Sequence, residues 1–318
     1  MIWLGAKRGY LSDWLTQQWV RATGRRVDFA RLPWLNGPTG FTHGIGPQFF
    51  EDYAARTGLE ILSGDSPRGL VQDLAAVLGG AQIHPAVVAF YERTSEYQMD
   101  CWSEWSSVFR PFGQLLALIF SRRLEQLNVP LAGLDTHRGI SSRVLLMRSP
   151  QGEMQAAWVR QLLASQRTLY AGSYSTCVVP GYAGRCIKVC FPLPNGRAIV
   201  IMRPQVHPDG SLTVISDGQE FGDPGFYFVV EQEDAAWARY VRTMKESIHV
   251  YAAEAETVRA DHTLRIWNQV FLQLHYRLAA KQFAGPLILE KMPEKMPGKI
   301  PENESPAAER SRREDCRW

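Results

Sequence analysis

The chain has 318 residues, enough for one large domain or two smaller ones, and 45% of them are apolar, enough to build a full core. Its net charge of +3 is too small to indicate a nucleic-acid-binding protein. It has no run of about 18 apolar residues, and its first residues lack the apolar core of a signal peptide. We therefore expect a cytoplasmic protein without a membrane span.

The cysteine count points to the same compartment. The five cysteines form an odd set without a regular disulfide framework, as in proteins of reducing compartments. Cys186 and Cys190 lie four residues apart on an expected strand, about 13 Å from one another, too far to share a disulfide or a metal ion. We interpret the cysteines as small apolar residues of the core.

The first part of the chain predicts helices. A helix over residues 3–23 would end at Gly24, and one over 47–57 would begin with a proline and end at Gly58. Two more are expected over 69–78 and over 85–128, the last with a break near Pro111.

From Ser141 the apolar residues recur with a period of two, which is typical of strands. Strands are expected over 143–148, 154–162 and 168–179, and then as a β-meander over 185–191, 197–203, 212–216 and 226–230. Asn195-Gly196 should form a tight turn with positive φ at Gly196.

The end of the sheet is less regular. Residues 234–246 predict an inserted helix, and 248–252 another strand. The alternation over 264–278 favours one long strand, although the same residues would also line a helix capped by Asp261. Residues 286–318 are expected to be a disordered tail, because so polar a segment cannot bury enough apolar area.

These elements predict an α+β fold. A mainly helical region, 1–130, packs on a curved antiparallel sheet within 131–285, and we expect the two to fold together as one domain. The order of helices followed by a sheet resembles helix-grip and lipocalin-like cups, as an analogy of fold class only. No family motif matches residue by residue.

Motifs with a specific chemistry are missing from the sequence. It contains no P-loop, HExxH, CxxC, EF-hand loop or nucleophile elbow, and no two histidines stand four residues apart. We therefore expect neither a metal nor a cofactor.

The candidate site residues are ionisable side chains within apolar stretches. Proton transfer is assigned to His262 or His275, with Tyr276 beside them, because histidine titrates near neutrality. Arg160 and Arg203 would hold a carboxylate or phosphate by paired hydrogen bonds. At least three of these five should reach one concave pocket, whose walls come from Trp105, Phe109 and Phe271. The alternative is that they lie on solvated faces or form structural ion pairs.

Three functions remain open. The first is binding of a small, mostly apolar molecule with a polar end, in a pocket between helices and sheet. The second is a metal-independent isomerase, cyclase or hydrolase that uses the same pocket. The third is a protein-interaction module. The sequence indicates nothing about the oligomeric state.

Overall fold

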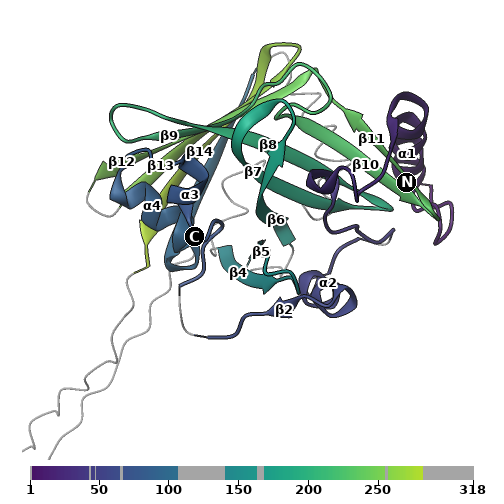
Figure 1. The fold of residues 1–318 in the computed structure, drawn as a ribbon, viewed down its shortest axis with the longest axis horizontal. Coiled ribbons are helices and arrows are strands. Elements are labelled where there is room, and N and C mark those ends of the chain that lie inside the picture. Colours follow the sequence, from purple (N-terminus) through teal and green to yellow (C-terminus); the bar gives the residue numbers. More distant parts are fainter. Residues whose placement is uncertain are drawn as a thin grey trace, which may run out of the picture. The chain divides into compact units, whose positions relative to one another are not determined.

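A large antiparallel sheet dominates the computed structural model, which describes residues 2–42, 44–46, 48–64, 67–106, 140–162, 168–254 and 257–281. Within these ranges fourteen strands join one sheet, and the sheet is strongly curved (Figure 1). Residues Met1–Lys281 form one compact unit, which contains every strand described below.

The main path of the sheet runs through eleven strands. In spatial order they are β2 (Glu60–Ile61), β4 (Ile140–Arg148), β5 (Met154–Leu162), β6 (Thr168–Val179), β7 (Tyr182–Leu193), β8 (Gly196–Val206), β9 (Leu212–Ser216), β12 (Met244–Glu254), β13 (Thr257–Ile266), β14 (Gln269–Ala280) and β3 (Tyr97–Trp105). A branch leaves β8 through β10 (Phe226–Gln232) and β11 (Ala235–Tyr240) to β1 (Arg25–Val27).

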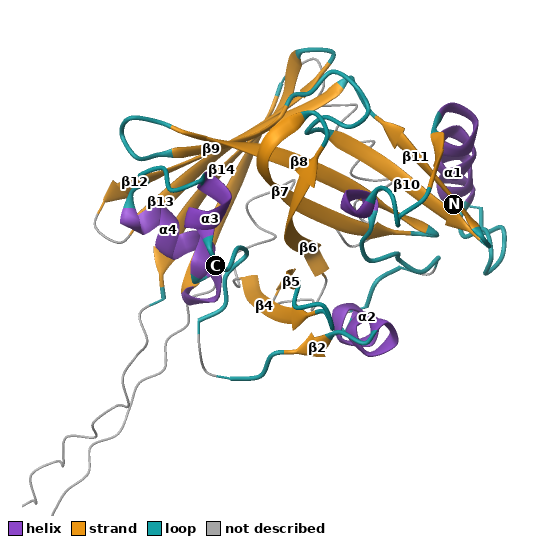
Figure 2. Cartoon of the chain, viewed as in Figure 1, coloured by secondary structure: helices purple, strands orange, loops and turns teal. Residues whose placement is uncertain are grey.

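Short helices cover parts of the sheet (Figure 2). They are α1 (Leu11–Thr23), α2 (Phe49–Thr57), α3 (Leu74–Leu78) and α4 (Pro85–Glu92), with 3-10 turns η1 (Pro33–Leu35) and η2 (Thr94–Glu96). Local sequence sets their ends: Asp73 accepts a hydrogen bond from the backbone N–H of Ala76 and so caps α3, and Pro85 opens α4.

The two faces of the sheet carry separate cores. We call the face that packs on α3 and α4 the inner face; its core includes Leu74, Phe90, Val200 and Val250. The opposite, outer face carries one core around Trp34 and Tyr227 and another in which α2 packs on β4, β5 and β6. Alternation along each strand produces this arrangement, since successive side chains point to opposite faces.

The predicted α+β class with a curved antiparallel sheet is confirmed. The strands expected over 154–162, 168–179 and 212–216 have the same bounds in the structure as β5, β6 and β9. Two expected helices are shorter than predicted, because α1 begins only at Leu11 and α3 only at Leu74.

Two predicted helices are wrong. Residues 234–246 form β11 and the start of β12, because β11 is hydrogen-bonded on both sides, to β10 and to β1. In the helix expected over 85–128, α4 ends at Glu92 and residues Tyr97–Trp105 form β3, which pairs with β14. The expected break near Pro111 lies outside the described residues.

Two predictions about the hairpins are also wrong. The single strand expected over 264–278 is a hairpin, since Trp267 and Asn268 take positive φ between β13 and β14. In the turn between β7 and β8, positive φ belongs to Asn195 and not to Gly196. Glycine is needed at position 196 for space, because an added Cβ would lie 2.1 Å from the carbonyl oxygen of Val229. The expected tail, 286–318, lies outside the described residues.

Candidate functional site

The two ends of the curved sheet approach one another across the inner face. Met99 of β3 packs against the core that contains Val144 and Trp158, which belong to β4 and β5. Side chains that are far apart along the sheet therefore meet inside the curve. The polar residues among them are the candidate site.

Arg160 is the most unusual of these residues. It lies on β5 opposite Tyr170 and is only 8% exposed, and its guanidinium lies 5.6 Å from the ring centre of Trp158. Within the described residues its Nε–H has no hydrogen-bond partner and no carboxylate forms an ion pair with it. A buried N–H without a hydrogen-bond partner is costly, and this makes Arg160 the first candidate for contact with a ligand.

Three tyrosines surround this charge. Tyr170 and Tyr174 lie on one face of β6, with their hydroxyl oxygens 2.5 Å apart. Tyr276 comes from β14, where it pairs with Cys101 of β3. The charge of Arg160 acts on all three phenols and on the Cys101 thiol, so the side chains lie near one another. We call Arg160, Tyr170, Tyr174 and Tyr276 the arginine–tyrosine cluster.

Burial keeps these tyrosines neutral. It raises the pKa of Tyr170 and Tyr276 well above the ordinary value of 10.0 and also raises that of Tyr174, although the positive charge of Arg160 lowers each of them. The pKa of the Cys101 thiol is raised by burial too. The phenols therefore stay protonated to a higher pH than ordinary tyrosines, and Arg160 is a positive charge near all three.

An imidazole–carboxylate pair lies on the same face. Nε2 of His262, on β13, is 2.9 Å from Oε2 of Glu246, on β12, and both side chains are largely buried. The His262 ring lies nearly parallel to the ring of Tyr276, with 6.5 Å between their centres. Such a pair can hold an imidazole in a fixed orientation for proton transfer.

Of the five polar candidates from the sequence, the inner face thus carries three: Arg160, His262 and Tyr276. The other two lie on the outer face. Nδ1 of His275 is 2.7 Å from Oδ1 of Asp261, and Arg203 pairs with Asp217.

Two of the three aromatic walls expected from the sequence, Trp105 and Phe271, lie farther along β3 and β14 than the cluster. Trp105 contacts Phe271, with 6.3 Å between ring centres, but it stands four residues beyond Cys101 along β3. Phe109 lies outside the described residues. Trp158 and Phe191 contact Tyr170, and Met99 packs against the same core as Tyr170 and Tyr174.

Tyr170, Tyr174 and Glu246 are functional candidates that sequence reasoning missed. The sequence could have indicated the two tyrosines, because they stand four residues apart on the correctly expected strand 168–179 and so share one face of it. Tyr170 also pairs with Arg160. No sequence pattern indicated Glu246, because residues 234–246 were assigned to a helix.

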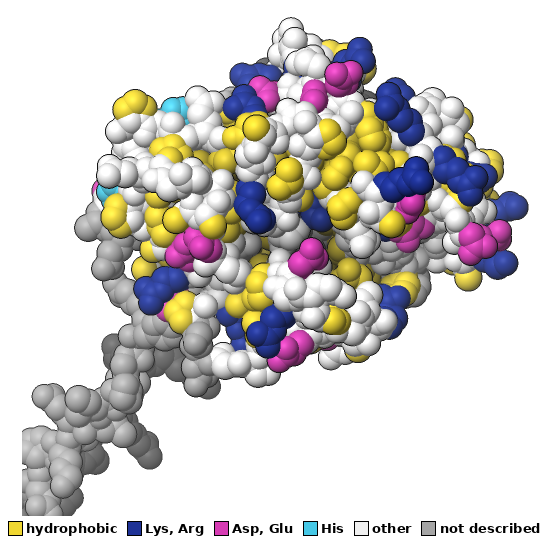
Figure 3. Space-filling view, in the orientation of Figure 1, with side chains coloured by type: hydrophobic (Ala, Val, Ile, Leu, Met, Phe, Trp, Pro, Cys, Tyr) yellow, Lys and Arg dark blue, Asp and Glu magenta, His cyan; other side chains and the backbone are white. Residues whose placement is uncertain are grey.

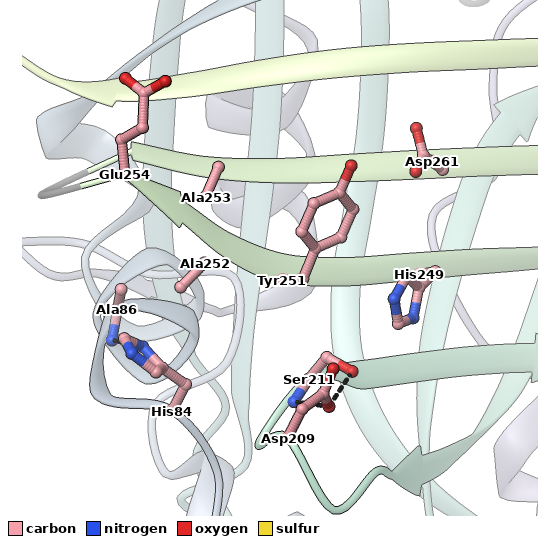
Figure 4. Close-up of a pocket in the computed structure, with 10 residues that line it drawn as sticks. All are labelled: His84, Ala86, Asp209, Ser211, His249, Tyr251, Ala252, Ala253, Glu254 and Asp261. Carbon is pink, nitrogen blue, oxygen red and sulfur yellow. Dashed lines mark hydrogen bonds between the residues drawn. The ribbon is translucent and has the colours of Figure 1, made fainter.

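A hollow lies elsewhere, at the rim and on the outer face, between the start of α4, the β8–β9 turn and β12 (Figure 4). Its volume is about 610 Å³, and His249, Tyr251 and Asp261 line it together with Asp209 and Ser211. The Asp209 carboxylate is already bonded to Ser211, and His249 is bonded to Thr213. We prefer the inner face because its charged group has no such partner. Among the described residues, no group of His, Cys, Asp or Glu is arranged to hold a metal ion.

Comparison with known proteins gives little further information. No family model and no solved structure matches the chain. It is 26% identical over 219 residues to "Uncharacterized membrane protein YndJ" of Bacillus subtilis (strain 168). This match covers 66% of the chain but 38% of that relative, so the chain spans well under half its length. Within the described residues, no helix is both long and apolar enough to cross a membrane.

Proposed function

We propose that the protein binds a small, mostly apolar molecule with one anionic end, a carboxylate or a phosphate. The observation that carries the proposal is the buried guanidinium of Arg160, which lies among aromatic side chains with its Nε–H unbonded. An anionic group would supply the missing partner through paired, charge-assisted hydrogen bonds.

The rest of the inner face suits the same ligand. Tyr276 and one of the hydrogen-bonded pair Tyr170 and Tyr174 can donate from their phenols to the anionic end. Met99, Trp158 and the apolar core around α3 and α4 offer contacts to the remainder of the molecule. Small-molecule sites usually have this composition, with a few polar groups among many apolar ones.

Binding of a dansyl-labelled undecanoate and of its methyl ester tests the proposal. The native protein should prefer the acid, and Arg160→Gln should weaken binding of the acid by roughly 10- to 100-fold, as expected for a lost charged hydrogen bond. Binding of the ester should change little. Arg203→Gln is the matched control, because Arg203 lies on the outer face and pairs with Asp217. Equal binding of acid and ester by the native protein would contradict the proposal.

The close pair of His262 and Glu246 favours a second candidate, a metal-independent isomerase, cyclase or hydrolase that acts on the bound molecule. His262→Gln separates the two functions. In an enzyme it should abolish turnover and leave binding of the dansyl acid largely intact. In a binding protein no reaction is present to be lost.

We also propose that the protein works in a reducing compartment, the cytoplasm. Cys177 and Cys186 are paired across β6 and β7 yet carry free thiols, as do Cys101 and Cys190. Thiols so close together would be expected to oxidise in a compartment that favours disulfides.

A further inference from the structure

The N-terminal segment exposes large apolar side chains that the inner-face site does not use. Ile2 is 63% exposed, Trp3 46%, Leu15 54% and Trp19 41%. Leu15 and Trp19 stand four residues apart and so share one face of α1. The carbonyl of Ile2 accepts a hydrogen bond from the N–H of Leu11, which holds residue 2 beside the first turn of that helix.

The other face of α1 packs against the rest of the protein. The four exposed side chains, Ile2, Trp3, Leu15 and Trp19, are left on the open side, and we call them the apolar stripe. Asp13, Gln17 and Val20 are buried, and the Gln17 side chain donates to the carbonyl of Pro194. The Trp19 ring lies against Phe228 of β10, which fixes its position on the helix. The stripe is thus held by the fold with its outer side open to solvent.

Basic side chains border this stripe at both ends. Lys7 and Arg8 are exposed before α1, and Arg26 is exposed directly after it, on β1, where it pairs with Trp237. The neighbouring Arg25 points to the opposite face of the sheet, over the ring of Phe221. Figure 3 shows Lys and Arg side chains on the side of the molecule where α1 and β11 lie, with Asp and Glu side chains among them.

Two more arginines, Arg21 and Arg239, lie beside the stripe itself. The Arg239 guanidinium is 5.9 Å from the centre of the Trp19 ring, and that of Arg21 is 5.0 Å from Trp237. The positively charged groups of Arg21 and Arg239 therefore lie close to tryptophan rings beside α1.

Acidic side chains are set apart from the stripe. Asp13 on α1 is buried. Asp28 follows Val27, at the far end of β1, where it pairs with Arg31. Glu233 and Asp234 are exposed in the turn that precedes β11, and because Val27 pairs with Ala236 they too lie at that far end.

We propose that this surface, Ile2, Trp3, Leu15 and Trp19 with its basic border, docks on an anionic lipid bilayer. Tryptophan rings favour the headgroup level of a membrane, and a helix that carries them beside basic residues is typical of attachment in the plane of the interface. Each Lys or Arg near an anionic surface adds to the attraction. A second copy of the protein fits less well, because face-to-face contact would bring the two basic borders together.

Sedimentation of the intact protein with vesicles tests the surface. The protein should bind vesicles that contain 30% phosphatidylglycerol, should bind pure phosphatidylcholine vesicles poorly, and should dissociate as salt is raised. Lys7→Gln with Arg26→Gln should weaken binding roughly 30-fold, from about 1 kcal/mol for each charge. Ile2→Ser with Leu15→Gln should weaken it as well.

Matched controls make the outcome decisive. Arg265→Gln with Arg277→Gln removes the same charge from exposed positions on β13 and β14 and should leave binding unchanged. An equal loss in this control would mean that net charge alone acts, and the proposal would fail. Equal binding to neutral and anionic vesicles, no binding at all, or self-association that disappears with Ile2→Ser and Leu15→Gln would overturn it too. Circular dichroism checks that each variant is folded.

Discussion

At the scale of single residues, the cluster tyrosines link ionisation to stability. Burial raises the pKa of Tyr276 well above 10.0, the value expected in an unfolded chain. Below pH 10 the phenol is protonated in both states, and its contribution to stability is fully present. Above pH 10 the unfolded chain loses the proton first, so stability falls as the pH rises toward the folded-state pKa.

The free energy of unfolding should therefore decline above pH 10, by up to about 1.4 kcal/mol per pH unit for each such tyrosine. Urea unfolding between pH 8 and 11 measures the slope. Tyr276→Phe should make the decline shallower, because it removes one of these phenols. The decline in Tyr276→Phe is compared with that in Tyr182→Phe, since Tyr182 lies outside the cluster. An equally steep decline in native protein and Tyr276→Phe would contradict this linkage.

The placement of site residues was only partly readable from the sequence. Tyr276 and His275 are adjacent on a strand and must face opposite sides, so both could not enter one pocket. Parity thus predicts that one of them is excluded, but it does not say which face is concave. The concave face follows from how the sheet curves and brings β3 near β4 and β5, and no local sequence pattern contains these long-range contacts.

At the scale of elements, the turn between β7 and β8 shows a glycine required by space. Its neighbour Asn195 takes the positive φ, and Gly196 pairs with Val230 of β10. A Cβ at position 196 would overlap the Val229 carbonyl, a backbone atom that cannot rotate away. The backbone of β10 would have to shift, and β10 connects the main path of the sheet to β11 and β1.

We expect Gly196→Val to lower the free energy of unfolding by on the order of 1–3 kcal/mol. Thermal or urea unfolding measures the change. Gly46→Ala is the control, since a Cβ there meets nothing within 4 Å. Native-like stability in Gly196→Val would show that β10 can move away from this turn at little cost.

Local signals predicted some elements better than others. The strands from β5 to β9 were readable because turn residues separate short β-branched and aromatic runs. Strand β11 was not, since its alanines favour a helix until β10 and β1 supply hydrogen bonds on both sides. Strand β3 failed for a similar reason, because its aromatic residues fit either period and only pairing with β14 decides between them.

At the scale of the whole molecule, the compact unit that contains the sheet ends at Lys281. Strand β14 ends at Ala280, between β13 and β3, and the backbone N–H of Lys281 donates to the carbonyl of Glu96. The Lys281 ammonium donates to the carbonyl of Ser95. Met1–Lys281 is a compact unit of its own and contains all four hydrophobic clusters.

Deletion of residues 282–318 should therefore leave the melting temperature unchanged within about 2 °C, because no described core residue is removed. Differential scanning calorimetry of the full chain and the shortened one makes the comparison. A chain ending at Ile266 is the contrasting variant. It lacks β14, which pairs with both β13 and β3 and supplies the buried Leu278, so it should lose the cooperative transition. A clear drop in melting temperature after the first deletion would mean that residues beyond Lys281 stabilise the core.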